Sequence, residues 1–316
     1  MTASPDQATP ILAVQDLTKR FGPVQAVRGV SFQVWAGQTF GIVGESGSGK
    51  STTARLLLRL IEPTSGEVQF QGRDLLALGA RAMREQRRHL QMVFQDPMGS
   101  LNPRMTVGEL IAEPMLVHGI GTAVTRRQRA QALLDEVGLP ASALTRFAHE
   151  FSGGQRQRIA IARALATEPA LVVADEPVSA LDVSVQAQVL NLLLDLKDRH
   201  GTTMVFISHD LRVIEFMCDQ VAVMYLGEMV EAGPKAQVFA APQHPYTRAL
   251  FDSMPGRGAA APHLQGEIPS PSAVPSGCAF RTRCPQAHAR CASEAPASRS
   301  VGAGHVAACH LLDAAP

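Results

Sequence analysis

The sequence has few aromatic residues and no excess of charge of either sign. Aromatic side chains make up 5% of the 316 residues, and 29 basic residues face 28 acidic ones, which gives a formal net charge of +1. A chain whose net charge is this close to zero has no strong long-range field that attracts nucleic acid or an anionic membrane surface. Scarce aromatic rings also provide no platform on which bases could stack. We therefore expect no nucleic-acid partner.

Long apolar runs are also missing. No stretch reaches the roughly eighteen consecutive apolar residues that a membrane-spanning helix needs. Residues 1–6 contain neither the basic nor the apolar segment of a secretory signal. These absences predict a cytoplasmic protein whose membrane role is peripheral. Hydrophobic residues make up 46% of the chain, enough for a sizeable core.

Strand-like and helix-like patterns alternate through most of the chain, which predicts an α/β fold with a parallel-sheet core. The expected strands are residues 11–17, 30–34, 39–43, 66–70, 90–94, 171–174 and 204–207. The expected helices are residues 52–60 and 185–196, with a mainly helical segment at 106–148. Gly201 is a helix-stop residue after the second helix.

The composition changes after residue 253. Residues 254–275 are rich in proline, glycine and alanine and have little periodicity, which predicts a linker. Four of the five cysteines follow this linker. We therefore predict a main domain at residues 1–253, with a helical subdomain at about 96–165, and a linker with a Cys-rich extension at residues 254–316.

A glycine-rich turn lies between the expected strand 39–43 and the helix after it. It fits the pattern of a glycine, four residues and then Gly-Lys-Ser that binds nucleotide phosphates. Glycines let successive backbone N–H groups point at phosphate oxygens, the lysine reaches the terminal phosphates and the serine hydroxyl binds Mg²⁺. The predicted ATP-binding residues of this loop are Gly44, Glu45, Ser46, Gly47, Ser48, Gly49, Lys50, Ser51 and Thr52.

An acidic pair follows the apolar run at 171–174. Asp175 ends the expected buried strand, where a carboxylate can hold Mg²⁺, and Glu176 is placed to act as general base on the attacking water. An Asp-Glu pair can also simply open a loop, but the upstream phosphate loop favours the catalytic interpretation.

A second anion site is predicted about a hundred residues after the first. Ser152 is a natural N-cap, and Gly153 and Gly154 leave backbone N–H groups uncovered at the start of a helix. With Gln155 these residues form the sequence Ser-Gly-Gly-Gln, and here the chain resembles the nucleotide-binding subunits of ABC transporters. Phe151 stands where that family usually has leucine. The resemblance covers about residues 11–253, and it implies a P-loop NTPase fold with a parallel-sheet core, a small antiparallel β subdomain and a helical subdomain that carries the Ser-Gly-Gly-Gln sequence.

The resemblance implies roles for four more residues. Phe21 corresponds to the aromatic residue that stacks on adenine, although a lone phenylalanine more often packs in a core. Gln95 corresponds to the glutamine that contacts Mg²⁺ and the attacking water. Asp182 lies in the loop that contacts the opposite subunit's site. His209 corresponds to the switch histidine, which contacts the γ-phosphate and the general base, so Glu176, His209 and Lys50 are the implied catalytic residues.

The resemblance also implies partners and a mechanism. In the family, the Ser-Gly-Gly-Gln helix closes on ATP held by the phosphate loop of a second ATPase subunit, so that two ATPs are sandwiched in a head-to-tail dimer. The segment 95–103 resembles the corresponding segment of peptide and nickel importers. The segment 176–188 is similar to the second of the two ATPase subunits of dipeptide and oligopeptide importers, and residues 244–250 resemble the start of the C-terminal extension of that group. This implies a P-loop ATPase that powers import of dipeptides or oligopeptides at the cytoplasmic face of the inner membrane. The implied partners are a similar, non-identical ATPase subunit, two permease subunits and an extracytoplasmic solute-binding protein.

Two other functions are compatible with parts of the sequence. The first is an importer ATPase for nickel or another solute. The second is an ABC ATPase that acts on nucleic acid. The segment between Gln95 and Ser152 is too short for the long insertions of repair ATPases. The chain also has one ATPase cassette, whereas translation factors of this family usually have two.

The four clustered cysteines, Cys278, Cys284, Cys291 and Cys309, allow several interpretations. Disulfides fit poorly with a reducing cytoplasm. Zinc sites commonly contain close Cys-x₂-Cys pairs, which are absent, although histidines lie nearby. Four thiolates also suit a [4Fe–4S] cluster, and idle thiols are a further alternative. The resemblance to peptide-importer ATPases with a similar tail implies a [4Fe–4S] cluster, with zinc as the alternative.

Overall fold

The computed structural model describes residues 9–254 and 266–314. The chain divides into two compact units, Met1–Leu76 with Ile207–Pro316, and Ala77–Phe206. Half of the predicted linker (residues 255–265 of 254–275) and the N-terminal residues 1–6 lie outside the described part. The predicted boundary at residue 253 lies inside the first of these units, which is not divided further, so that boundary stays a prediction.

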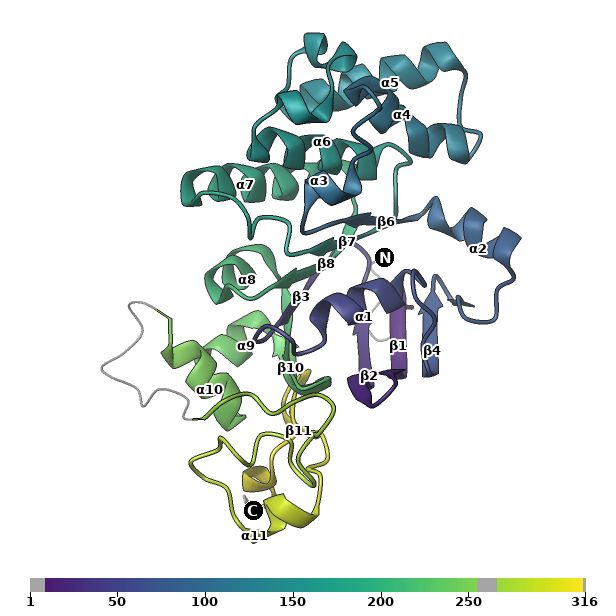
Figure 1. The fold of residues 1–316 in the computed structure, drawn as a ribbon. Coiled ribbons are helices and arrows are strands. Elements are labelled where there is room, and N and C mark those ends of the chain that lie inside the picture. Colours follow the sequence, from purple (N-terminus) through teal and green to yellow (C-terminus); the bar gives the residue numbers. More distant parts are fainter. Residues whose placement is uncertain (1–8, 255–265, 315–316) are drawn as a thin grey trace, which may run out of the picture. The chain divides into compact units, whose positions relative to one another are not determined.

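The first unit contains two groups of strands. In the antiparallel sheet the order is β2-β1-β4-β5, and β1, β2 and β4 lie side by side in Figure 1. Its strands are β1 (Leu12–Phe21), β2 (Val24–Val34), β4 (Ser65–Phe70) and β5 (Arg73–Asp74). Inward residues such as Leu12 and Val68 are fully buried, as the alternation of apolar and polar residues requires for a sheet with one covered face.

The second group of strands in this unit carries the phosphate loop. Strand β3 (Thr39–Val43) pairs in parallel with β9 (Gln220–Tyr225), which pairs antiparallel with β10 (Glu228–Pro234). The extension adds two strands here that the sequence did not predict: β12 (His305–Ala307) pairs with β10, and β11 (Arg299–Gly302) pairs with β12. The helices of this unit are α1 (Lys50–Leu57), α8 (Leu211–Met217), α9 (Lys235–Ala240), α10 (Pro245–Asp252), α11 (Ala289–Ser293) and the 3-10 turn η4 (His310–Ala314).

The second unit combines parallel strands with a group of helices. Strand β6 (Leu90–Val93) pairs in parallel with β7 (Leu171–Asp175), and β8 (Thr203–Ser208), which ends just past the unit boundary, is next to β7 in the strand order. Helices α4, α5 and α6 lie together in Figure 1. The helices are α2 (Ala80–Arg87), α3 (Pro97–Ser100), α4 (Val107–Val117), α5 (Ala123–Glu136), α6 (Gly153–Leu165) and α7 (Val183–His200), with 3-10 turns η2 (Ala141–Thr145) and η3 (Ala148–Glu150).

The elements confirm the predicted fold class: parallel strand pairs, a small antiparallel sheet and a helical segment. Strand 39–43 has the predicted bounds, and Gly201 ends α7 with a φ of 61°. The predicted helix 52–60 begins two residues earlier and ends three residues earlier than expected. Among the described residues, no helix combines the length and hydropathy needed to cross a membrane.

Candidate nucleotide site and the Cys-rich extension

The phosphate loop connects β3 to α1, as predicted. All five residues of β3 are buried, which fixes the point at which the loop leaves the core. Helix α1 begins at Lys50, and its N-cap is Gly49, with no side chain capping it. A helix N-terminus without a side-chain cap presents backbone N–H groups and the positive end of the helix dipole to an anion. Residues 44–52 therefore form one continuous loop and helix start of the kind that binds phosphate.

Two glycines of this loop are required by their surroundings. A Cβ atom on Gly49, whose φ is 105°, would lie 2.3 Å from the carbonyl oxygen of Ala26. A Cβ atom on Gly44 would lie 2.1 Å from the carbonyl oxygen of Met224. No other residue type fits at either position without moving the backbone, so the glycine pattern reflects the close approach of neighbouring chain segments.

Lys50 is almost entirely buried and points back along its own loop. Its Nζ atom donates hydrogen bonds to the carbonyl oxygens of Gly44, at 2.8 Å, and Glu45, at 2.9 Å. The ammonium group is thereby held inside the curl of the loop, where it can meet the terminal phosphates of a nucleotide.

Phe21 and His209 also belong to the first unit. Phe21 ends β1, and 48% of its surface is exposed, with the ammonium of Lys19 4.8 Å from the centre of its ring. Core packing, the competing interpretation of Phe21, is therefore wrong. His209 is exposed between β8 and α8, directly before Asp210, which caps α8 by accepting a hydrogen bond from the backbone N–H of Arg212.

The second unit holds the predicted acidic pair and the glutamine. Asp175 is the buried last residue of β7. Glu176, which follows it, has a φ of 46°, a conformation that is costly for a non-glycine residue and typical of functional sites. The side-chain amide of Gln95 donates a hydrogen bond to Glu176, 3.2 Å from nitrogen to Oε2. The structure thus brings together two residues that lie 81 positions apart.

The Ser-Gly-Gly-Gln segment begins α6, as predicted. Ser152 is the N-cap, and it forms a capping box with Gln155: the serine N–H donates to the Gln155 side chain at 3.0 Å, and the Gln155 N–H donates to the Ser152 hydroxyl at 3.4 Å. A Cβ atom on Gly154 would lie 2.4 Å from the Val185 side chain. Phe151 is buried beside the guanidinium of Arg146, as an apolar replacement for leucine would be.

Asp182 is the N-cap residue of α7, and it is exposed. Its side chain makes no capping hydrogen bond. An exposed carboxylate at the start of a helix is available to a partner, as the resemblance implies.

The helices of the second unit form an apolar pocket of about 720 Å³. It lies among α4, α5 and η2, and Leu116 and Val117 on its wall are 62% and 46% exposed. These exposed apolar side chains beside a pocket make this surface a candidate interaction site.

The four cysteines of the Cys-rich extension lie near one another. Burial raises the pKa of the Cys278 thiol to about 11; the Phe280 N–H opposes this, and the nearby thiols of Cys291, Cys309 and Cys284 add to it. Burial also raises the pKa of Cys284 and Cys309. None of the four forms a disulfide. Within residues 9–254 and 266–314, no three His, Cys, Asp or Glu side chains are grouped closely enough to hold a metal ion.

Buried polar contacts attach the extension to the rest of its unit, and the sequence did not predict them. Glu231 of β10 is fully buried; its carboxylate lies 2.7 Å from His305 Nε2 of β12 and accepts the backbone N–H groups of Gln243 and His244. Arg283 pairs with Glu45 of the phosphate loop. The resemblance at residues 244–250 does not reveal that the backbone N–H of His244 binds Glu231, because the two residues are brought together only by the fold.

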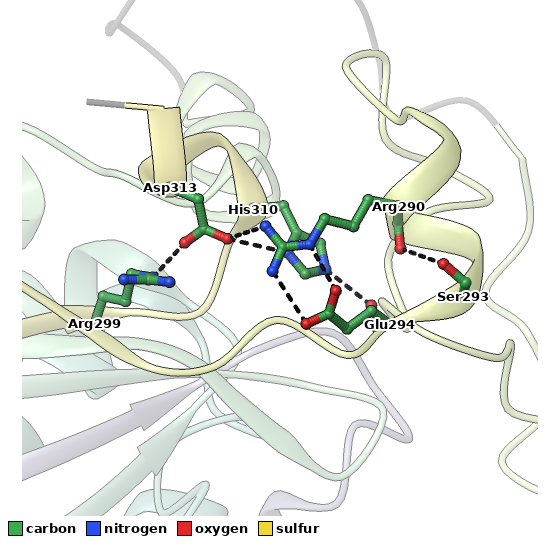
Figure 2. A network of polar contacts seen from close by, with 6 residues as sticks. All are labelled: Arg290, Ser293, Glu294, Arg299, His310 and Asp313. Carbon is green, nitrogen blue, oxygen red and sulfur yellow. Dashed lines mark hydrogen bonds and ion pairs between the residues drawn. The ribbon is translucent and has the colours of Figure 1, made fainter. Parts of the chain in front are cut away.

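A second polar network lies within the extension (Figure 2). Asp313 pairs with Arg290 and Arg299, and His310 Nδ1 lies 3.5 Å from the same carboxylate. Arg290 also pairs with Glu294, 2.6 Å from Nε to Oε2. Figure 2 shows these side chains converging from α11, β11 and η4.

Comparisons with known proteins identify the family of the chain. Residues 27–179 match the family described as ABC transporter, and residues 230–291 match the family described as the C-terminal region of oligopeptide/dipeptide transporters. The chain is 53% identical to a peptide import ATP-binding protein of Brucella ovis, over 95% of this chain and 98% of that protein. It is 47% identical to the oligopeptide transport ATP-binding protein AppF of Bacillus subtilis, over 98% and 99%.

The similar solved structures are also ATP-binding cassettes or subunits of ABC transporters. The ATP-binding cassette MJ0796, in a dimeric post-hydrolysis state with ADP and phosphate, is 31% identical with a TM-score of 0.65, over 71% of this chain and 98% of that one. The subunit cbiO1 of a Clostridium perfringens ABC transporter complex is 27% identical with a TM-score of 0.66, over 73% and 91%. Fold and phosphate loop define a P-loop ATPase. The chain belongs to the ATP-binding subunits of ABC transporters.

Proposed function

We propose that this chain powers peptide import as one ATPase subunit of a transporter, attached peripherally to the cytoplasmic face of the membrane. The observation that carries the proposal is the joint match to an ABC transporter family and to the oligopeptide/dipeptide C-terminal region on one chain. Relatives that align over nearly the whole length are named for peptide import. These names favour peptides over nickel, and over a function on nucleic acid.

Within this function, residues 44–52 hold the phosphates of ATP, and Phe21 stacks on the adenine. The exposed ring of Phe21 and the buried ammonium of Lys50 support these roles. Ser51, Gln95 and Asp175 supply oxygen ligands, which Mg²⁺ prefers. When bound, Mg²⁺ neutralises charge on the phosphates.

Glu176 acts as the general base, oriented by Gln95, and His209 contacts the γ-phosphate. The hydrogen bond from Gln95 and the left-handed backbone of Glu176 support this assignment. A Glu176→Gln variant keeps the shape and the hydrogen-bonding partner but cannot accept the proton of water. We expect it to bind ATP, to accumulate as an ATP-bound closed dimer and to lose nearly all hydrolysis, measured in the assembled transporter. Turnover close to that of the unaltered protein would show that Glu176 is not the base.

The remaining site residues serve the partner subunit. Ser152, Gly153, Gly154, Gln155 and Asp182 contact ATP held by a similar, non-identical ATPase, and the start of α6 and the exposed Asp182 support this role. The apolar pocket among α4, α5 and η2 receives a permease subunit. A Leu116→Asp substitution should prevent co-purification with the permeases, whereas Val124→Asp on the exposed surface of α5, outside the pocket lining, should not.

The four cysteines hold a [4Fe–4S] cluster in this proposal. A four-iron cluster takes one thiolate per iron, whereas zinc needs four ligands within about 2.3 Å of one ion. The proximity of the four thiols supports a shared ligand set. Among the described residues, no three of these side chains are grouped closely enough to hold a metal ion, so the metal content decides between cluster, zinc and free thiols. The cluster would cross-link a segment with little core of its own.

Anaerobic purification of the full-length chain tests the metal. Four iron and four sulfide per chain, lost in a Cys291→Ser variant and retained in Cys218→Ser, is the expected result. A colourless protein with one zinc per chain would overturn the cluster, and a metal-free protein would show that the thiols are idle. Transport itself is tested with the assembled complex in liposomes: peptide bound to the solute-binding protein should stimulate ATP hydrolysis, and Ni²⁺ should not.

A further inference from the structure

Glu45 is an acidic residue in a loop that binds a polyanion. Its carboxylate forms an ion pair with Arg283: the distance from Arg283 Nη1 to Glu45 Oε2 is 2.7 Å, and that from Nη2 to Oε1 is 3.1 Å. This is a bidentate pair, the strongest geometry available to arginine and a carboxylate. Arg283 belongs to the Cys-rich extension, 238 residues away in sequence, and both residues lie in the same compact unit.

The pair is shielded from water. The Arg283 side chain is 5% exposed and that of Glu45 is 25% exposed. The guanidinium lies 5.9 Å from the centre of the Tyr225 ring, and Phe280 packs edge-on against Tyr225 at 5.3 Å. Pairing with Glu45 raises the pKa of Arg283, so the guanidinium stays charged. Removing one partner from such a pair leaves an uncompensated charge with little solvent to stabilise it.

The backbone of Glu45 is held from the same side. Its N–H donates a 3.0 Å hydrogen bond to the hydroxyl of Tyr246 in α10. Tyr246 is fully buried and packs against Phe280 with ring centres 5.4 Å apart. Both contacts therefore act on the second residue of the loop, whose carbonyl oxygen also accepts a hydrogen bond from Lys50.

Arg283 is held by hydrogen bonds within the part of the Cys-rich extension that carries Cys278, Cys284 and Cys291. It directly precedes Cys284, and its backbone N–H donates to the carbonyl of Phe280 at 3.0 Å. The same turn begins at Cys278, whose N–H donates to the carbonyl of Cys291 at 2.9 Å. The position of the guanidinium is therefore set by the fold of the segment that carries the cysteines.

We propose that Arg283 is a positioning residue of the phosphate loop: it neutralises Glu45 and holds the curl of the loop, so that the Cys-rich extension sets the ATP affinity of its own chain. Without Arg283, the Glu45 carboxylate repels the phosphates at close range, an effect that is strong where little solvent screens it. The proposal rests on the function of the phosphate loop given above.

The test is ATP affinity of the full-length chain with Mg²⁺, measured by displacement of a fluorescent ATP analogue. Arg283→Ala should weaken binding at least tenfold, and Arg283→Lys should weaken it less, because the charge remains but the bidentate geometry is lost. Arg281→Ala is the matched control: Arg281 is in the same turn, but its guanidinium donates hydrogen bonds to Ser276 and not to the phosphate loop, so ATP binding should be unchanged. In the assembled transporter, the KM for ATP should rise more than kcat falls.

A double substitution separates positioning from folding. Glu45→Gln combined with Arg283→Ala should bind ATP more tightly than Arg283→Ala alone, because the unneutralised carboxylate is gone. Equal binding by Arg283→Ala and Arg281→Ala, or no recovery in the double variant, would overturn the inference while leaving the ATP site intact. Absence of ATP binding by the unaltered chain would overturn the proposed site as well, and that result is distinct from the other two.

Discussion

The phosphate loop and the Cys-rich extension lie in one compact unit but are built in opposite ways. The loop is shaped by backbone: buried β3 precedes it, glycines meet neighbouring carbonyl oxygens, and no side chain caps the helix after it. The extension is shaped by side chains: a buried glutamate–histidine contact, arginine–carboxylate pairs and four thiols. A site formed by backbone groups is recognised in the sequence as a short contiguous motif. A region held by side-chain contacts involves residues that are scattered along the sequence and show no motif.

The largest expected effect comes from breaking the backbone side of this comparison. Gly49→Ala adds a Cβ atom 2.3 Å from the Ala26 oxygen at a φ of 105°, so we expect a loss of more than about 3 kcal/mol in unfolding free energy and no measurable ATP binding. Gly47→Ala is the control: its φ is also positive, at 80°, but nothing lies within 4 Å, so it should cost about 1 kcal/mol. Equal losses in denaturant unfolding would show that space around Gly49 is not the constraint.

The next largest effect is expected from removing a side-chain contact that attaches the Cys-rich extension. Glu231→Ala removes a fully buried acceptor of two backbone N–H groups and of His305, and should destabilise the unit by about 3 kcal/mol. We expect faster proteolysis of the extension than of residues 9–254. Glu228→Ala, on the same strand, removes a partly exposed pair with Arg28 and should cost about 1 kcal/mol or less. Similar protease sensitivity in both variants would contradict the special role of Glu231.

A smaller effect is pH-dependent. Burial, aided by the charge of Arg248, lowers the pKa of His244 from 6.5 to about 3, and its Nδ1 accepts the backbone N–H of Tyr246 at 3.0 Å. The folded protein keeps this imidazole neutral while the unfolded chain binds a proton, so stability is lost as pH falls from 6.5 towards 3. The slope contributed by this group is roughly 1 kcal/mol per pH unit.

The His244→Asn variant isolates this contribution. Asparagine also caps helices well but does not titrate. Between pH 7 and pH 5, the unfolding free energy of the variant should fall less steeply than that of the unaltered chain. Parallel curves would show that His244 is not the source of the acid sensitivity.

The smallest effect is expected in the network of Figure 2, whose two arginines are about half exposed, although Asp313 is 17% exposed. Asp313→Asn removes the charge that Arg290 and Arg299 share, but solvent screens such surface pairs. Thermal unfolding should change less than in Glu231→Ala and should depend less on salt than in the unaltered chain. A loss as large as that of Glu231→Ala would show that the network, rather than the buried glutamate, fastens the extension.

Local patterns predicted much of the molecule. The bounds of β3, the end of α7 at Gly201 and the N-cap at Ser152 follow from periodicity and capping chemistry. Strands β11 and β12 were missed because they are short: β12 pairs with β10, about 70 residues away in sequence, and β11 pairs only with β12. Strands of three or four residues show too little periodicity to be predicted from the sequence. The exposure of Phe21 also could not be read from sequence, since a phenylalanine at the end of a strand can face either side.

By itself, the sequence determined the class of protein and predicted the residues of the phosphate loop, because such a loop depends on contiguous backbone and on glycines at fixed spacing. Only the tertiary structure joined Gln95 to Glu176 and Arg283 to Glu45. These contacts depend on how strands and turns that are distant in sequence pack together. The sequence around a charged residue does not identify the residue that neutralises its charge.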